Sequence, residues 1–138
     1  MEQLAVEIVG LCREYGECRV EVERMEEVRR VKNALESVCA MARQRLDISD
    51  PALLLALLDA YEVTRDEGML QEVLDVVGRN LDRLAVSAES VKLLAYCYYY
   101  VEEEECAERA RRMLEELRKM GRGEEELADA ETILEELT

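Results

Sequence analysis

The sequence predicts an all-α protein of about seven helices, and three observations lead to this prediction. Apolar side chains recur three and four residues apart along nearly all of the 138 residues, which is the period of an α-helix. One proline and six glycines provide too few breaks for a sandwich or barrel of many short strands. Because 49% of the residues are hydrophobic, the chain can bury a core, and we expect a single helical domain over residues 1–138.

Residues 1–46 predict an N-terminal pair of helices. The first covers about residues 2–15, and Gly16 is expected to end it. Residues 19–23 alternate between polar and apolar side chains, so a short extended segment is expected there. A long helix then continues to about residue 46. Its core stripe is Met25, Val28, Val31, Leu35, Val38, Ala42 and Leu46.

Two more helices follow a clear boundary at residues 47–51. Ser49 or Asp50 can cap a helix, and Pro51 suits the first helical position. The helix over 51–64 is apolar on almost every side, so we expect it in the centre of the core or in an interface between two copies of the chain. The next helix covers about 67–84, and Gly78 inside it indicates close packing with another helix.

Three helices complete the chain. Ser87 is expected to cap a helix over about 88–101. Another helix follows the acidic run Glu102–Glu105 and ends at Met120, with Gly121 as its C-cap. The C-terminal helix covers about 124–137. Because all the linkers are short, neighbouring helices are expected to form antiparallel hairpins.

The helices of residues 51–84 are repeated in those of residues 88–120 with an offset of 37 residues. Tyr61 aligns with Tyr98 in this comparison. The other aligned positions are Leu54 with Val91, Leu57 with Leu94, Ala60 with Cys97, Leu70 with Ala107, and Val77 with Leu114. Self-similarity at such a period is typical of proteins built from stacked helical repeats.

The segment Val91–Leu117 resembles a tetratricopeptide repeat. Leu94-Ala95 stands at the position of that family's Leu-Gly pair, Tyr98 at its tyrosine and Ala107 at its interhelical alanine. Small residues at these positions let the two helices of a hairpin approach closely, and the tyrosine fills the space beside them.

The resemblance covers roughly residues 51–120. It implies a short right-handed array of two stacked antiparallel hairpins, with the helices of 1–46 and 124–137 as caps. The sequence departs from the family's pattern at Leu58, at Arg111, and in lacking a helix-ending proline after either copy. An unrelated helical bundle is the alternative.

One side of the helix over 88–101 is rich in tyrosine. At about 100° per residue, the expected core side consists of Val91, Leu94, Ala95, Tyr98 and Val101. The opposite side consists of Lys92, Leu93, Tyr96, Tyr99 and Tyr100. That second side either packs on a neighbouring helix or a second copy, or recognises a partner, because tyrosine suits interfaces.

The resemblance implies that the first helix of each hairpin lines a concave face that binds peptide segments. The implied partner-binding residues are Lys92, Tyr96, Tyr99, Tyr100, Leu55, Asp59 and Glu62. We therefore predict a non-enzymatic protein–protein interaction or scaffold module. A homodimer that buries part of the 51–64 helix or the tyrosine side is also expected, because large exposed apolar patches are rare on monomers.

The net charge of −15 restricts the partners. An acidic surface repels nucleic acids and anionic membranes, so a protein partner of basic character is expected. The alternative is a small acidic helical subunit of a nucleic-acid-processing complex. That alternative rests on a local basic stretch of Arg109, Arg111, Arg112, Arg118, Lys119 and Arg122.

The residue inventory argues against catalysis and against cofactors. Histidine is absent, which removes imidazole acid–base chemistry and imidazole metal ligands. The chain has no glycine-rich phosphate loop and no nucleophile elbow, so no enzyme, no cofactor and no metal are expected. Glu102–Glu105 is attributed to the favourable placement of acid in a first helical turn.

The five cysteines are expected to be buried thiols. Disulfides between Cys12 and Cys18 or between Cys97 and Cys106 are the alternative, because each pair flanks an expected turn. High charge with two Asn and three Gln is typical of thermophiles, in which intracellular disulfides occur. With no recognisable leader or membrane span, a cytoplasmic location is expected.

Overall fold

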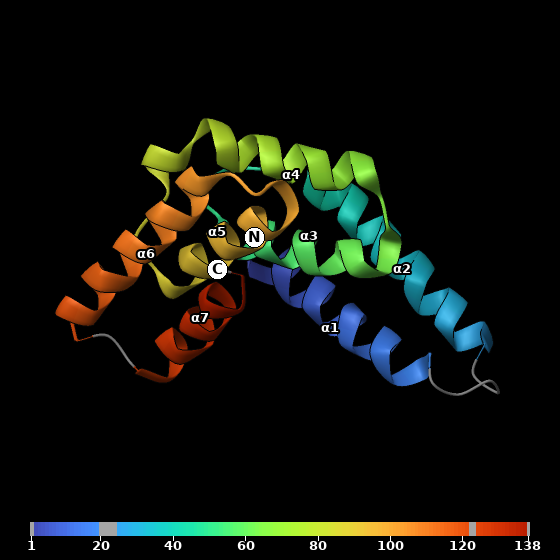
Figure 1. The fold of residues 1–138 in the computed structure, drawn as a ribbon. Helices are drawn as coiled ribbons and strands as arrows, with labels where there is room; N and C mark the ends of the chain where they lie inside the picture. The colour runs from blue at the N-terminus through green and yellow to red at the C-terminus, as the bar shows by residue number, and fades with distance from the viewer. Residues whose placement is uncertain (1, 20–24, 122–123, 138) are drawn as a thin grey trace. The chain divides into compact units, whose positions relative to one another are not determined.

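A computed structural model describes residues 2–19, 25–121 and 124–137 of the chain (Figure 1). These residues form seven α-helices and no β-strand, which confirms the all-α prediction and the number of helices. The helices are α1 (Glu2–Cys18), α2 (Met25–Arg43), α3 (Pro51–Thr64), α4 (Glu67–Arg79), α5 (Ala88–Val101), α6 (Glu104–Lys119) and α7 (Glu124–Leu137). A short 3₁₀ turn, η2, covers Leu81–Arg83.

The chain divides into two compact units, Met1–Asp75 and Val76–Thr138. In the first unit, α1 contacts both α2 and α3, and α2 contacts α3. In the second unit, α5 contacts both α6 and α7, and α6 contacts α7. Each unit therefore contains three helices in mutual contact, and α4 carries the chain from the first unit into the second.

The apolar helix α3 is buried on most of its surface. Leu54 and Leu57 are 0% exposed, and Leu53 and Leu58 are 1% and 2% exposed. Asp59 is exposed, so only a narrow strip of α3 faces solvent. The prediction that this helix lies within the core is confirmed. Since its leucines are buried within one chain, they do not by themselves require a second copy.

Several helix ends differ from the sequence-based prediction. The prediction that Gly16 ends the first helix is wrong, because α1 continues to Cys18. Gly16 is exposed and tolerated there, since a single helical glycine costs only about 1 kcal/mol. Helix α2 ends at Arg43, and α4 gives way to η2 after Arg79. The extended segment expected at 19–23 lies almost entirely outside the described residues.

The N-termini of α3 and α5 have the same cap, 37 residues apart. The Asp50 carboxylate accepts a hydrogen bond from the Leu53 amide at 3.3 Å. The Ser87 hydroxyl accepts one from the Ser90 amide at 3.1 Å. Such caps satisfy amides that have no partner within the helix, so both predicted caps are confirmed.

The C-termini of the same two helices also match. Arg65 and Glu102 both adopt the left-handed conformation, with φ of 54° and 52°. Their amides donate to the carbonyls of Tyr61 and Tyr98 at 2.8 Å and 2.7 Å. Because few non-glycine residues adopt a positive φ, the same conformation at two positions 37 residues apart shows that the sequence repeat extends to the backbone of the turns.

The interpretation of Gly78 as a site of close packing is wrong. Gly78 is exposed, and a Cβ atom added there would meet no atom within 4 Å. Helix α6 ends at Lys119 and its C-cap is Met120 rather than Gly121, which follows it with a φ of 66° in the left-handed region that glycine favours. Among the described residues, no helix has both the length and the apolar character needed to cross a membrane.

Substitution of Gly78 by alanine is expected to stabilise the protein by about 0.5–1 kcal/mol, because alanine loses less backbone entropy in a helix and meets no clash here. The matched Gly121→Ala variant is expected to destabilise by about 1 kcal/mol, because alanine is strained at positive φ. Urea denaturation of both variants measures the difference. Loss of stability in Gly78→Ala would contradict the solvent-facing placement of this residue.

Candidate functional site

The buried side of α5 is wider than the sequence predicted. Leu93, expected on the outer side, is 0% exposed. Tyr98 is only half-buried and Val101 is 40% exposed, although both were expected in the core. The physical reason is that α6 and α7 both contact α5, so burial extends around more than half of the helix. Val101, the last residue of α5, is not enclosed by these two helices and is therefore exposed.

The remaining outer side of α5 forms a stripe of Lys92, Tyr96 and Tyr99, spaced four and three residues apart. The Lys92 ammonium lies 3.8 Å from the Asp129 carboxylate of α7, so this end of the stripe faces a helix of the same unit. Tyr96 is half-buried, and Tyr99 is 58% exposed. The solvent-facing part of the predicted site is therefore the C-terminal end of α5.

Tyr99 and Tyr100 contact each other at this end. Their ring centroids are 5.1 Å apart and the ring planes meet at 75°, an edge-to-face arrangement. Such pairs contribute about 0.5–1.5 kcal/mol beyond the area they bury. Tyr100 is half-buried, so the exposed Tyr99 ring rests against a ring that is partly enclosed in the fold.

The other three predicted residues belong to the first unit, on α3. Leu55 is half-buried, and Asp59 and Glu62 are exposed. The Glu62 carboxylate lies 3.5 Å from the Arg65 guanidinium. These residues correspond, at the offset of 37, to Lys92, Tyr96 and Tyr99 in that order. The seven predicted residues thus comprise two equivalent outer stripes, one in each unit, together with Tyr100.

Each stripe ends at a turn that is held by a tyrosine hydroxyl. In the α3–α4 turn, the Tyr61 hydroxyl donates to the Glu67 carboxylate at 2.5 Å, and this bond raises the pKa of Tyr61. In the α5–α6 turn, the Tyr98 hydroxyl donates to Glu104 at 3.5 Å. The Arg65 guanidinium also lies over the Tyr61 ring, 5.7 Å from its centroid.

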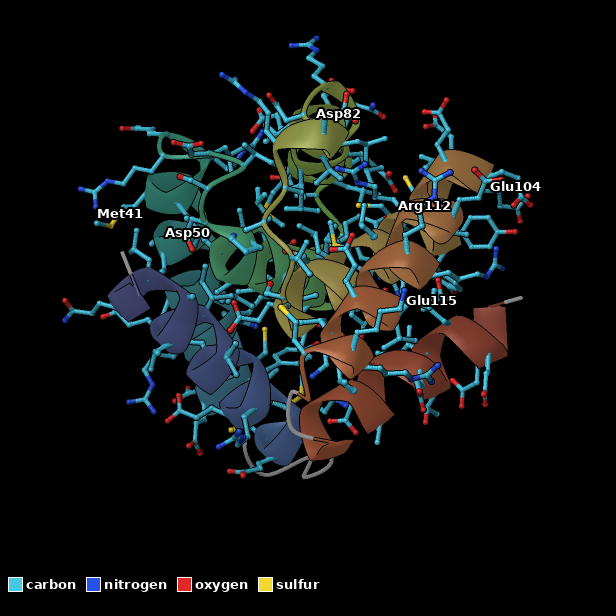
Figure 2. The ribbon with its side chains drawn as sticks, turned by 90° about the vertical axis from the view of Figure 1, so that its left-hand side faces the viewer. Met41, Asp50, Asp82, Glu104, Arg112 and Glu115 are labelled. Carbon is cyan, nitrogen blue, oxygen red and sulfur yellow. The ribbon has the colours of Figure 1, made fainter. Side chains whose placement is uncertain are left out.

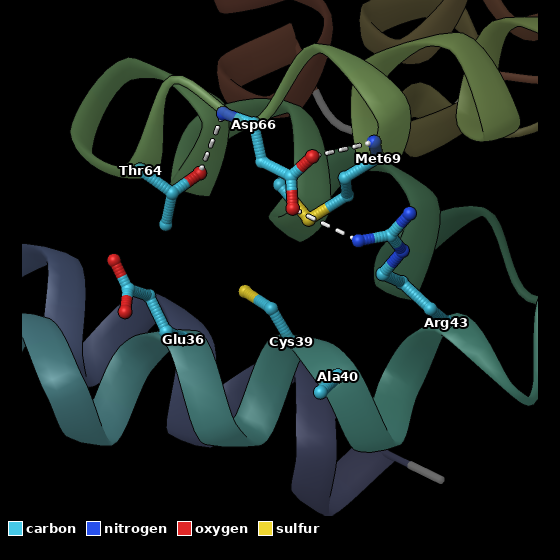
Figure 3. Close-up of a pocket in the computed structure, with 7 residues that line it drawn as sticks. All are labelled: Glu36, Cys39, Ala40, Arg43, Thr64, Asp66 and Met69. Carbon is cyan, nitrogen blue, oxygen red and sulfur yellow. Dashed lines mark hydrogen bonds and ion pairs between the residues drawn. The ribbon is translucent and has the colours of Figure 1, made fainter.

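A pocket of about 400 Å³ in the first unit was not found by sequence reasoning (Figure 3). The Glu36 carboxylate and the Cys39 thiol point from α2 towards the α3–α4 turn. The full lining is Glu36, Cys39, Ala40, Arg43, Thr64, Asp66 and Met69. These residues come from two segments more than twenty positions apart, so no local motif marks the pocket.

Arg43 closes one end of this pocket by joining α2 to α4 (Figure 3). Its Nε and Nη2 atoms donate to the two carboxylate oxygens of Glu72 at 2.8 Å and 2.7 Å. Its Nη1 atom donates to Asp66 at 2.8 Å, and Asp66 also accepts a bond from the Met69 amide at 3.1 Å. The hydrogen bond from Arg43 lowers the pKa of Glu72, and the same bond raises the pKa of Arg43.

The five cysteines are free thiols in this structure. Four are buried and Cys12 is half-buried. Burial, followed by the charge of Asp59, raises the pKa of Cys12 to about 11. Burial is also the main cause that raises the pKa of Cys39 to about 12, so the thiol in the pocket is protonated at neutral pH.

The basic stretch on α6 is partly neutralised by acids from other elements. Arg109 lies 3.7 Å from Asp82 of η2, and Arg118 pairs with Glu131 of α7. Three oppositely charged pairs stand four residues apart on α6, and none of them forms an ion pair although the structure describes all six residues: Glu105 with Arg109, Glu108 with Arg112, and Glu115 with Lys119. A second pocket, of about 360 Å³, lies between η2 and α6 near Asp82 and Arg112 (Figure 2). Its lining mixes both charges.

The four carboxylates of Glu102–Glu105 are all exposed. None of them forms an ion pair with another described residue. Within the described part of the chain, no three His, Cys, Asp or Glu side chains are grouped so that they could hold a metal ion. The acidic run is therefore a solvent-facing negative surface next to the exposed end of α5.

Glu72→Gln is expected to make stability less dependent on pH between about 3 and 5. The folded-state pKa of Glu72 lies below its unfolded value, so its contribution is complete above about pH 4.5 and is lost as pH falls through the folded pKa. Because the side chains are 29% and 45% exposed, the loss at pH 7 should be about 1 kcal/mol or less. Urea denaturation at pH 7 and pH 3 measures this, and an equal loss at both values would contradict the assignment.

Tyr61→Phe is expected to lower the urea midpoint more than Tyr98→Phe does. The Tyr61 hydroxyl makes a short bond to Glu67 in a buried setting, whereas the Tyr98 hydroxyl makes a long bond at a half-buried position. Both substitutions keep the ring, so packing is matched. Equal shifts of the two midpoints would show that the two turns are held equally.

Comparison with known proteins leaves the function to be argued from the chain's own residues. No protein-family model, no curated protein and no solved structure matches the sequence.

Proposed function

We propose that this protein is a non-enzymatic interaction or scaffold module that binds a protein partner through the outer stripe of α5. The observation that carries the proposal is the 58% exposure of Tyr99, on a helix that buries Leu93, Leu94 and Cys97. A large aromatic ring left in solvent and braced by a second ring has the properties of an interface anchor.

In this proposal the chain is a short tetratricopeptide-like array with right-handed stacking. Support comes from the N-caps at Asp50 and Ser87 and from the left-handed residues Arg65 and Glu102, which recur at the offset of 37. Further support comes from the equivalent stripes on α3 and α5, since repeat proteins commonly present one helix of each hairpin to a partner. Leu55, Asp59 and Glu62 would then form an equivalent surface of their own on α3 in the first unit.

The partner is proposed to be basic, because the net charge is −15 and residues 101–138 hold fourteen acidic against six basic side chains. The five free thiols fit a reducing compartment, so we place the module in the cytoplasm. The nucleic-acid alternative loses support because Arg109 and Arg118 are neutralised within the chain.

Tyr99→Ala is expected to weaken binding of the protein partner by about 2 kcal/mol or more, as loss of an interface anchor does. Its effect on unfolding should stay near about 1 kcal/mol, because the ring is largely exposed and the main loss is its edge-to-face contact with Tyr100. The partner is isolated by pull-down from the native organism with and without nuclease, then titrated by calorimetry.

Val6→Ala is the matched control, since Val6 is 70% exposed but lies on α1 in the other unit. It should change neither stability nor affinity appreciably. The proposal fails if Tyr99→Ala binds as the unchanged chain does. It also fails if Tyr99→Ala unfolds the protein, or if nuclease abolishes the captured complex.

A further inference from the structure

The two repeated turns differ in one respect that bears on the partner. In the α3–α4 turn, the chain supplies its own cation: the Arg65 guanidinium lies 5.7 Å from the Tyr61 ring centroid and 3.5 Å from the Glu62 carboxylate. A guanidinium over a tyrosine face is attracted by the ring, and a neighbouring carboxylate adds to this attraction. Beneath this arginine, Tyr61 is only 7% exposed.

The α5–α6 turn has the same backbone but lacks the cation. Glu102 occupies the position of Arg65, with φ of 52° against 54°. Tyr98 occupies the position of Tyr61, and it is half-buried rather than buried. Tyr99 occupies the position of Glu62, so a second aromatic ring stands where the first turn has a carboxylate. The α5–α6 turn therefore has the tyrosine ring of the first turn, as Tyr98, but has Glu102 in place of the arginine that lies over that ring.

The surroundings of this turn are suited to a positive charge. Glu102, Glu103, Glu104 and Glu105 are exposed, and none forms an ion pair with another described residue. Tyrosine rings and carboxylates are the groups that bind an arginine side chain. Its flat guanidinium stacks on the rings, and its N–H groups donate hydrogen bonds to the carboxylates.

We propose that the α5–α6 turn binds an arginine side chain from an arginine-bearing segment of the protein partner, in the place over Tyr98 that Arg65 occupies over Tyr61. The proposal rests on the proposed function and specifies the chemistry of the partner at the same end of α5. Arginine is favoured over lysine because only the guanidinium combines stacking with paired hydrogen bonds.

The probe is a fluorescein-labelled nonapeptide of glycine, serine and three arginines. It is titrated against the full chain by fluorescence anisotropy at low salt, and the variants are compared with the unchanged chain at physiological salt. The same peptide with citrulline in place of arginine keeps the shape and removes the charge. We expect the arginine peptide to bind at least about tenfold more tightly than the citrulline peptide, and more tightly than a lysine peptide.

The decisive variant is Glu102→Arg, which places in the second turn the residue that the first turn already has. Arg65 shows that this backbone conformation accepts arginine, so the fold should be retained, as circular dichroism and urea denaturation would verify. The new arginine should cover Tyr98 and weaken binding of the arginine peptide by about tenfold.

Glu115→Arg is the control of equal charge change. Glu115 is exposed on α6, ten residues beyond Glu105 and therefore about 15 Å along the helix (Figure 2). That distance exceeds the screening length of about 8 Å at physiological salt, so this variant should weaken binding less than about twofold at that salt concentration.

The possible results separate this inference from the proposed function. Absence of arginine-peptide binding at low salt, equal binding of the citrulline peptide, or equal losses in Glu102→Arg and Glu115→Arg would overturn the inference. If the natural partner depends on Tyr99 but is unaffected by Glu102→Arg, the inference fails and the proposed function stands. If the partner depends on neither residue, both fail.

Discussion

Burial of one apolar helix in each unit is the constraint on which the rest of this structure depends. In the first unit α3 is enclosed with α1 and α2, and in the second α5 is enclosed with α6 and α7. Each fully buried leucine on these helices contributes about 2 kcal/mol, so Leu53, Leu54, Leu57 and Leu58 together outweigh any single ion pair in the molecule. Only a narrow stripe of α3 and of α5 faces solvent and is therefore available for binding.

The turns that follow these helices show how one backbone can serve two purposes. Both turns have a left-handed residue and a tyrosine hydroxyl bonded to a glutamate at the start of the next helix. The first turn is filled by its own arginine and is tied to α2 through Asp66 and Arg43. Among the described residues no arginine covers Tyr98 in the second turn, and its exposed Tyr99 ring and carboxylates make it the more suitable of the two for binding.

The distribution of charge supports this division. The basic residues of α6 are used in part by Asp82 and Glu131, whereas the acidic run Glu102–Glu105 forms no ion pair with another described residue. An acidic surface beside exposed aromatic rings favours basic partners and repels nucleic acid backbones. Because exposed charge attraction is screened by salt, the rings are expected to provide specificity and the carboxylates mainly attraction.

The sequence by itself determined the all-α class, the number of helices, the caps at Asp50 and Ser87 and the repeat of 37 residues. These features depend on local hydrogen bonding and on a period that is visible in the order of residues. Sequence reasoning placed Leu93 on the outer side and Tyr98 and Val101 in the core, and the structure shows otherwise. A helical wheel does not show that two helices pack on α5, nor at which residue of α5 their contacts end. It also predicted a helix end at Gly16 and close packing at Gly78, and both were wrong. The presence of a glycine in a helical sequence does not show whether the helix ends there or whether another helix packs against it.

Only the tertiary structure decided which charges meet. Arg43 contacts partners 23 and 29 residues away, and Arg109 bonds to η2 rather than to its own helix, so no spacing rule could find these contacts. It also decided that Arg65 covers Tyr61 while Tyr98 lies partly open. The physical reason is that side-chain contacts depend on how helices pack, and packing joins residues that the sequence keeps far apart.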